Sequence, residues 1–244
     1  MKVSVEKDYD QMSKRAAQMI AETIVSKTDA VLGLATGGTP EGCYAQLAQM
    51  HREEGLDFSR VTTFNLDEYL GLPPTHQQSY HRYIDERLFD RVNIDKNRTH
   101  IPDGLAPRPR KFCEAYERMI RSSGGIEVQV LGIGRNGHIG FNEPGSPFDS
   151  RTRVVDLSEE TRKDNSRFFG SIDQVPRQAI TMGLATIMEA RRIVLLASGV
   201  NKARAVEHSV NGPVTIEVPA SRLQRHRDCI FLLDEEAASI LSKG

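Results

Sequence analysis

The sequence has few cysteines, no long apolar run and almost no net charge. Cys43, Cys113 and Cys229 are odd in number and far apart, and they form no CxxC pair, which argues against a disulfide framework and against a zinc site. No stretch approaches the roughly 18 to 20 apolar residues that a membrane helix needs. The amino terminus also lacks the apolar segment of a secretion signal. These absences predict a cytoplasmic protein with ordinary thiols, no metal and no membrane partner.

The balance of positive and negative residues argues against nucleic acid and anionic lipid as partners. The 32 Lys and Arg against 33 Asp and Glu give a formal net charge of -1, so no whole-molecule field attracts nucleic acid or anionic lipid. Any anion must be bound by a local group of residues, and we expect a small-molecule substrate. With 244 residues, 39% of them hydrophobic, the chain can bury one large core, and we expect residues 1–244 to form a single domain.

Helical periodicity and short apolar runs alternate along the chain. Strands that are apolar throughout, separated by amphipathic helices, predict an α/β fold with a mostly parallel sheet and helices on both faces. Helices are expected near 12–24, 40–52, 80–92, 110–121, 178–190 and 202–210, and strands near 30–35, 61–66, 128–132, 193–197 and 229–233.

Polar clusters directly follow four of the predicted strands. In parallel sheets ligands gather at the carboxyl ends of the strands, so we expect the four clusters to share one site. They are Thr36–Thr39, Asp67 with Glu68, Asn136–Glu143 and Ser198–Lys202.

The segment LGIGRNGHIGFNEPG, residues 131–145, places Asn136, His138 and Glu143 among glycines that relax the backbone. A carboxylate can hold an imidazole in one tautomer and keep it able to carry a proton near neutral pH, which favours a catalytic histidine over a structural one. Metal binding is disfavoured because no second histidine lies nearby and HExxH spacing is absent.

The same segment formally contains the dinucleotide fingerprint GxGxxG, with Asp156 near the place of a ribose-binding acid. That fingerprint requires a helix to open at its third glycine, here Gly137. Gly140 and Pro144 interrupt the following residues and leave no helical period, so a nicotinamide cofactor is not expected.

Asp67, in FNLDEYLGL, stands at the end of a predicted strand, where a core residue would be apolar. A catalytic base is one interpretation, and a carboxylate that only caps the loop is the other. Glu68 would point away from Asp67 if the extended geometry continues, so we expect only one of the two to face the site.

A turn and two cations are candidates for binding a phosphate. Thr36, Gly37, Gly38 and Thr39 precede a predicted helix and can direct backbone amides at an anion, although a plain tight turn with Thr39 as cap is equally consistent. The Walker A lysine and its spacing are missing. Arg167 and Lys202 supply positive charge of the kind that a phosphate binds, although either alone would suit a solvated surface.

Together these blocks resemble the glucosamine-6-phosphate deaminase (isomerase) family. The resemblance runs through nearly the whole chain in the family's order, and the HIGFNEPG segment is specific. It is carried by LATGGTP, FNLDEYLGL, LGIGRNGHIGFNEPG, SRT followed by TRKDNSRFF, and SGVNKA.

The resemblance implies a modified Rossmann-like fold and conversion of glucosamine 6-phosphate and water into fructose 6-phosphate and ammonia, without metal or organic cofactor. It implies that Asp67 is the base for enolisation, and that Asn136, His138 and Glu143 open the sugar ring. It places the phosphate on residues 36–39, Arg167 and Lys202. Many relatives have Asp where this chain has Asn136, so we expect Glu143 to be the main carboxylate partner of His138.

Two rival functions remain at this stage. A 6-phosphogluconolactonase shares the superfamily fold but needs no base for an α-proton, which favours the deaminase because of Asp67. A silent sugar-phosphate sensor would usually carry a DNA-binding segment, for which the chain has neither spare length nor a basic patch. Residues 157–180 resemble the family's mobile lid. The short carboxyl terminus suggests an unregulated form, either a monomer or a homo-oligomer.

Overall fold

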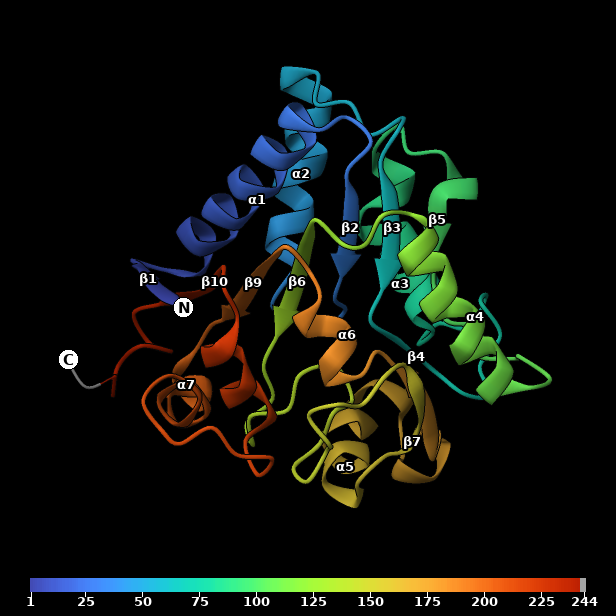
Figure 1. Ribbon diagram of the computed structural model, residues 1–244, viewed down its shortest axis with the longest axis vertical. Coiled ribbons are helices and arrows are strands. Elements are labelled where there is room, and N and C mark those ends of the chain that lie inside the picture. The colour runs from blue at the N-terminus through green and yellow to red at the C-terminus, as the bar shows by residue number, and fades with distance from the viewer. Residues whose placement is uncertain (242–244) are drawn as a thin grey trace.

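A parallel sheet of seven strands runs through the centre of the structure, a computed structural model in which residues 1–241 are described (Figure 1). Its strands are β1 (Lys2–Glu6), β2 (Val31–Leu34), β3 (Thr62–Asn65), β5 (Thr99–His100), β6 (Val128–Gly132), β9 (Arg192–Ala197) and β10 (Cys229–Asp234). They lie in the order β1-β10-β9-β6-β2-β3-β5, and each neighbouring pair is parallel.

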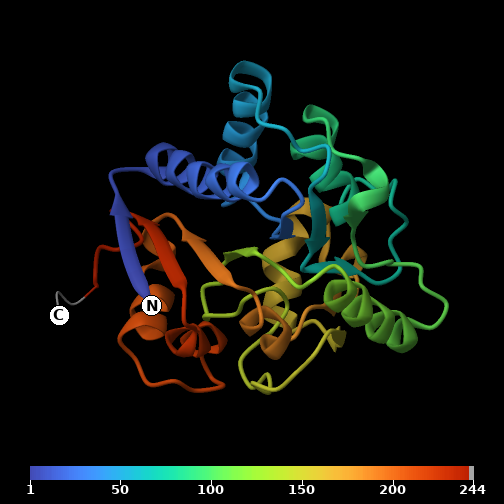
Figure 2. The same cartoon turned by 45° about the horizontal axis from the view of Figure 1, so that its top comes forward.

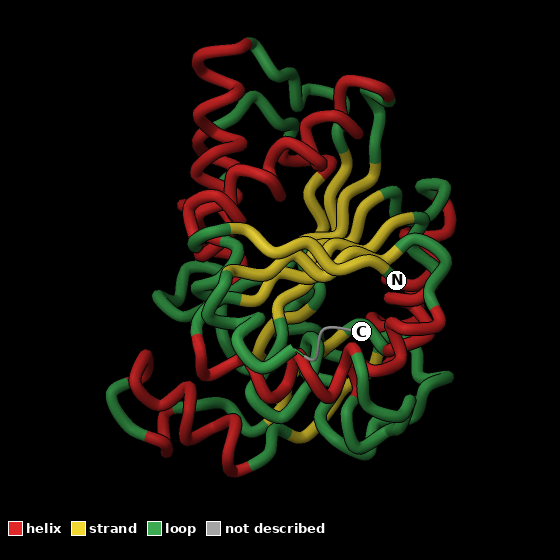
Figure 3. Tube along the Cα trace, turned by 90° about the vertical axis from the view of Figure 1, so that its left-hand side faces the viewer, coloured by secondary structure: helices red, strands yellow, loops and turns green. Residues whose placement is uncertain are grey.

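Helices lie on both sides of this sheet (Figure 3). They are α1 (Tyr9–Ser26), α2 (Glu41–Glu54), α3 (Tyr80–Arg87), α4 (Pro109–Ser122), α5 (Glu159–Phe169), α6 (Leu184–Met188) and α7 (Ala203–Val210), with 3₁₀ turns η1 (Phe89–Arg91), η2 (Lys96–Arg98), η3 (Ile172–Gln174), η4 (Val200–Lys202) and η5 (Pro219–Arg225). None of the helices in residues 1–241 combines the length and the apolar character needed to cross a membrane.

The amphipathic pattern explains how α1 forms and packs. Asp8 caps its amino terminus by accepting a hydrogen bond of 2.9 Å from the Gln11 amide. Met12, Ala16 and Ile20, spaced four residues apart, are all 0% exposed and face the core. In the sheet, residues 193–197 of β9 are also 0% exposed, as expected for a strand covered on both faces. The predicted α/β fold is therefore confirmed.

A second, antiparallel sheet was not predicted. It consists of β4 (Asp67–Tyr69), β8 (Gln178–Thr181) and β7 (Arg153–Asp156), in the order β4-β8-β7. The expected helix at 178–190 is wrong in its first part, because residues 178–181 form β8 and only 184–188 are helical as α6. Strands of three or four residues are too short to show a period of two against a helical pattern.

The small sheet and α5 lie beyond the carboxyl ends of β2, β3 and β6, towards which the arrows of those strands point (Figures 1 and 2). An apolar cluster joins these elements, and Tyr69 of β4 packs against Phe169 of α5 with ring centroids 5.5 Å apart. The other buried members of the cluster are Phe141, Leu157, Val175 and Ala179. The small sheet and α5 therefore cover the edge where the sequence predicts a site.

Candidate active site

The four polar clusters follow four strands that are contiguous in the large sheet. These strands are β9, β6, β2 and β3, and the cluster of each comes directly after its carboxyl end. From β2 the chain continues to β3 on one side, whereas from β6 it continues to β9 on the other. A crevice forms where the direction of strand order changes in this way, and ligands of open α/β sheets bind there.

Asp67 is the first residue of β4 and is only 5% exposed. Burial, reinforced by the charge of Glu68, raises the pKa of its carboxyl from 3.8 to about 8. A Cβ atom on Gly140 would lie 3.4 Å from Oδ2 of Asp67, so the 138–143 loop passes beside this carboxyl. A carboxylate in such surroundings accepts a proton far more readily than a solvated one.

Asn136 connects His138 to Glu143. Its Nδ2 donates a hydrogen bond of 3.0 Å to Oε2 of Glu143. Because an ionised carboxylate can only accept, this contact fixes the orientation of the amide and turns Oδ1 towards His138, 2.8 Å from Nδ1. An amide oxygen also only accepts, so Nδ1 carries the hydrogen. Nε2 of His138 is then the nitrogen that can take up a proton.

Glu143, the expected carboxylate partner of His138, is paired with it at longer range than a hydrogen bond. Nδ1 lies 3.7 Å from Oε2 of Glu143, which is beyond hydrogen-bond distance, and the direct bond comes from Asn136. The side-chain amide of Asn136 therefore connects the Glu143 carboxylate to His138 by hydrogen bonds. The histidine ring itself packs onto Gly134, where a Cβ atom would lie 2.1 Å from Cε1 of His138 and would displace the ring.

The other oxygen of Glu143 binds the first turn of α5. Its Oε1 accepts hydrogen bonds from the hydroxyls of Ser158, at 3.3 Å, and Thr161. Ser158 is also the N-cap of α5, where it accepts from the Thr161 amide at 3.1 Å. Neither Ser158 nor Thr161 was among the residues predicted for the site. A serine before a helical run signals a cap, but nothing in the sequence points to its contact with Glu143.

The Thr36–Thr39 turn precedes α2, and two tyrosines hold its backbone. The Tyr83 hydroxyl donates to the Gly37 carbonyl at 2.6 Å, and the Tyr9 hydroxyl donates to the Gly38 carbonyl at 3.1 Å. Gly37 has φ +101°, a conformation that favours glycine. Both glycines are exposed, so their amides are accessible to a ligand.

The two candidate cations lie in different surroundings. Lys202, in η4 after β9, donates a hydrogen bond of 2.7 Å from Nζ to the Ile133 carbonyl and so reaches the loop that carries His138. Arg167 lies in the exposed last turn of α5, with its guanidinium 4.6 Å from the centroid of the Phe168 ring. Among the described residues, no contact joins Arg167 to the 36–39 turn.

Glu68 does not face the 138–143 loop with Asp67, as expected for neighbours in a strand. Its carboxylate accepts hydrogen bonds from the backbone amides of Tyr69, Tyr80 and His81 at 2.8, 3.0 and 3.0 Å. Glu68 is 1% exposed, and burial raises its pKa from 4.5 to about 7 against the opposing effect of these amides.

The segment after Gly137 and the three cysteines bear on the predictions about cofactors, thiols and metals. The described residues 137–152 contain no helix after Gly137, so the dinucleotide fingerprint lacks its structural context. Cys43, Cys113 and Cys229 are free thiols, as predicted, and all three are buried. Within the described part of the chain, no cluster of His, Cys, Asp and Glu could hold a metal ion.

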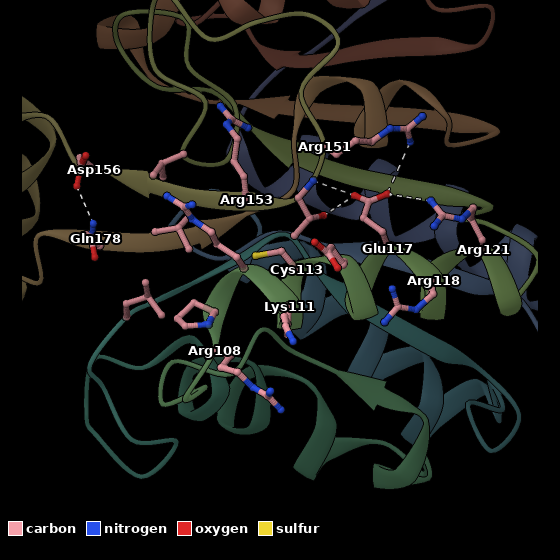
Figure 4. A pocket seen from close by; sticks show the side chains of 17 residues that line it. Arg108, Lys111, Cys113, Glu117, Arg118, Arg121, Arg151, Arg153, Asp156 and Gln178 are labelled. Carbon is pink, nitrogen blue, oxygen red and sulfur yellow. Dashed lines mark hydrogen bonds and ion pairs between the residues drawn. The ribbon is translucent and has the colours of Figure 1, made fainter.

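A hollow lies elsewhere, between α4 and β7 (Figure 4). It has a volume of about 1160 Å³, and none of the candidate residues lines it. Its buried carboxylate, Glu117, accepts hydrogen bonds from the backbone amide and hydroxyl of Thr152 and from the Thr186 hydroxyl, at 2.9, 2.6 and 2.5 Å. Arg121 and Arg151 pair with the same carboxylate. Glu117 therefore ties α4 to its neighbours, and we place the site at the strand ends.

Comparison with known proteins identifies relatives along the whole chain. The sequence profile described as glucosamine-6-phosphate isomerases/6-phosphogluconolactonase matches residues 5–231. A glucosamine-6-phosphate deaminase from Halothermothrix orenii is 56% identical over 241 residues, which cover 99% of this chain and 100% of that protein. A protein of the same name from Bacillus velezensis is 52% identical over 238 residues, with 98% and 99% covered.

Solved structures agree with these matches. The structure of a monomeric glucosamine-6-phosphate deaminase has a TM-score of 0.97 and 50% identity, and the match covers 98% of this chain and 100% of that one. The 6-phosphogluconolactonase of Trypanosoma brucei has a TM-score of 0.79 at 23% identity, with 99% and 98% covered, which shows a shared fold alone. The chain therefore belongs to the family of glucosamine-6-phosphate isomerases and 6-phosphogluconolactonases.

Proposed function

We propose that this protein is a glucosamine-6-phosphate deaminase, which converts glucosamine 6-phosphate and water into fructose 6-phosphate and ammonia. Relatives of that name are 50 to 56% identical over nearly the full length of the chain. The structural observation that carries the proposal is the Asp67 carboxyl, which is buried at the carboxyl end of the sheet, beside the loop of His138.

His138 opens the sugar ring in this mechanism. Its Nε2 takes the proton of the anomeric hydroxyl and returns a proton to the ring oxygen, so the C1–O5 bond breaks and C1 becomes an aldehyde. Asn136 supports the step by holding the hydrogen on Nδ1, and Glu143 stabilises the positive charge that forms transiently on the ring.

Asp67 then moves a proton from C2 to C1. The C2 hydrogen lies α to the new carbonyl and is therefore acidic enough for a carboxylate to remove, which gives an enol bearing the amine. Return of the proton to C1 leaves an imine at C2. Water adds to this carbon and ammonia leaves, which yields the ketose. Only protons and water are exchanged, so we propose that no metal or organic cofactor takes part.

The phosphate end is assigned to the Thr36–Thr39 turn, Lys202 and Arg167. The amides of the turn stand before α2, whose dipole favours an anion, and Lys202 adds a positive charge from the end of β9, which β6 separates from β2. Fixing the phosphate holds the flexible open chain with C2 near the base. Arg167 contributes in a closed state, since in this structure it lies in an exposed turn of α5.

Three compounds in parallel assays test the function. Purified protein is expected to release ammonia from glucosamine 6-phosphate and to leave 6-phosphogluconolactone unhydrolysed. N-acetylglucosamine 6-phosphate, whose amine is blocked, should give no ammonia, and its addition to the first assay reveals any activation. Lactone hydrolysis without ammonia release would overturn the proposal. Because the substrate is a phosphorylated sugar of central metabolism, we also place the enzyme in the cytoplasm.

A further inference from the structure

Glu68 is a buried carboxylate that the mechanism above does not use. It follows Asp67 directly in β4 and is 1% exposed. An ionised carboxylate is rarely buried so completely unless it is fully hydrogen-bonded. Each of its oxygens accepts at least one backbone amide, and two of these amides, from Tyr80 and His81, belong to another element, α3.

These contacts fasten the start of α3 to β4. The first amides of a helix have no partner within the helix. In α3, Glu68 accepts from Tyr80 and His81, and the Ser79 side chain accepts from Arg82 at 3.1 Å. A negative charge at this end also interacts favourably with the helix dipole. The position of α3 is therefore fixed relative to the strand that begins with Asp67.

The same helix holds the phosphate turn. The Tyr83 hydroxyl of α3 donates to the Gly37 carbonyl at 2.6 Å, and the Tyr80 side chain forms a hydrogen bond with Thr36. A continuous path therefore runs from Asp67 through Glu68 and α3 to the turn. The two ends of the proposed substrate site are held apart by this path.

We propose that Glu68 is a positioning residue for deamination, which sets the distance between Asp67 and the phosphate turn through α3 and strengthens Asp67 as a base through its neighbouring charge. This inference rests on the proposed function. It gives the second acid of the DEY segment a defined part in turnover without direct contact with the substrate.

Glu68 is a neighbouring charge that raises the pKa of Asp67. The phenols of Tyr44, Tyr69, Tyr80 and Tyr116, from α2, β4, α3 and α4, also interact with Asp67. Burial raises the pKa of each phenol, so all four are uncharged at neutral pH. Desolvation and the charge of Glu68 are the causes that raise the pKa of Asp67.

Glu68→Gln tests the charge. The amide has nearly the same shape, although its NH2 group cannot accept from one of the backbone amides that Glu68 binds. It carries no charge, so the acid limb of the kcat/KM profile should move to lower pH by about one unit. The matched control is Glu86→Gln, which removes one negative charge from the exposed side of α3, where Glu86 pairs with Arg82 at 2.7 Å. The control should keep the wild-type profile, and a role of Glu68 in packing alone would not move the limb.

Glu68→Asp tests the anchor. It keeps the charge but is one methylene shorter and cannot reach both α3 amides, so the acid limb should stay while KM for glucosamine 6-phosphate rises by about tenfold. If Glu68→Gln does not fold, the KM of Glu68→Asp carries the test alone.

Three results would overturn the inference: a wild-type profile for Glu68→Gln, an equal shift for Glu86→Gln, or an unchanged KM for Glu68→Asp. Ammonia release by the unmodified protein is measured first in the same assay. Its absence would instead overturn the proposed function.

Discussion

At the residue scale, the proposed mechanism depends most directly on the carboxyl of Asp67. Asp67→Asn keeps the shape of the side chain but cannot take up the C2 proton. Ammonia release should fall by about 10²- to 10⁴-fold, while binding of the sugar phosphate is retained. In deuterated water, the wild-type product should gain deuterium at C1 and the variant should form none. Undiminished turnover would remove Asp67 from the mechanism.

The same substitution should change how stability depends on pH. The pKa of Asp67 is raised from 3.8 to about 8 in the folded protein, so the folded state holds this proton more tightly than the unfolded chain. The stabilising contribution is fully present below about pH 4 and is lost as pH rises through about 8. Thermal unfolding temperatures should therefore fall with pH less steeply for Asp67→Asn than for wild type. Parallel curves would contradict the raised pKa.

Part of the candidate site could be predicted from the residue types alone. Asp67 stands where a strand residue would be apolar, and the polar side chains of residues 136–143 lie among glycines, so both depart from core patterns. The link from Glu143 through Asn136 to His138 could not be predicted, because it depends on how the side-chain amide is turned, with its nitrogen towards Glu143 and its oxygen towards His138. The partners of Glu68 could not be predicted either, because the backbone amides that it binds in α3 are 12 and 13 residues further along the chain.

At the element scale, α5 is tied to the candidate active site by its first turn. Thr161→Val removes the hydroxyl that binds Glu143 and keeps the side-chain shape. We expect faster amide hydrogen exchange in α5 and a kcat lower by roughly 2- to 10-fold. Ser166→Ala is the control, since its hydroxyl donates only within α5, to the Lys163 carbonyl at 2.7 Å. Equal exchange rates in both variants would show that the contact does not hold the helix.

The turn after β9, η4, carries Lys202 and is expected to contribute to binding of the substrate phosphate. Lys202→Met removes the positive charge and keeps the length of the side chain, so KM for glucosamine 6-phosphate should rise by about tenfold or more with an unchanged pH profile. Arg167→Ala should act in the same direction. The exposed Lys14 of α1, changed to Met, provides the control. An unaltered KM in Lys202→Met would make the phosphate assignment wrong.

Sequence patterns located α1, α2, α3, α4 and α7 and the strands β2, β3, β6, β9 and β10, and they missed β1, β5, α5 and the small sheet. The predicted strand at 128–132 coincides with β6, and the helix expected near 110–121 is α4, because these segments show clear apolar periods. The strands β4, β7 and β8 are three or four residues long, and their pairing depends on segments distant in the sequence, such as Asp67 with Thr181. Local propensity carries little information about such pairings.

At the scale of the whole molecule, the core encloses every thiol. Cys43, Cys113 and Cys229 are 0, 3 and 1% exposed, and burial raises their pKa values to about 12, 11 and 12. A thiol reagent should therefore react with none of them rapidly in the native protein and with all three after denaturation. A thiol titrated quickly without denaturant would show that the fold opens locally around it.

The pairing of β1 with β10 has a consequence for biosynthesis. Among the described strands, β1 pairs with β10 alone, with Lys2 opposite Ile230 and Glu6 opposite Asp234. Ribosomes add roughly 5 to 20 residues each second, so the first strand made waits on the order of ten seconds or more for its partner. Until then its backbone hydrogen-bonding groups are open to chaperones or to other nascent chains. This sheet is thus completed only after residues 229–234 have been synthesised.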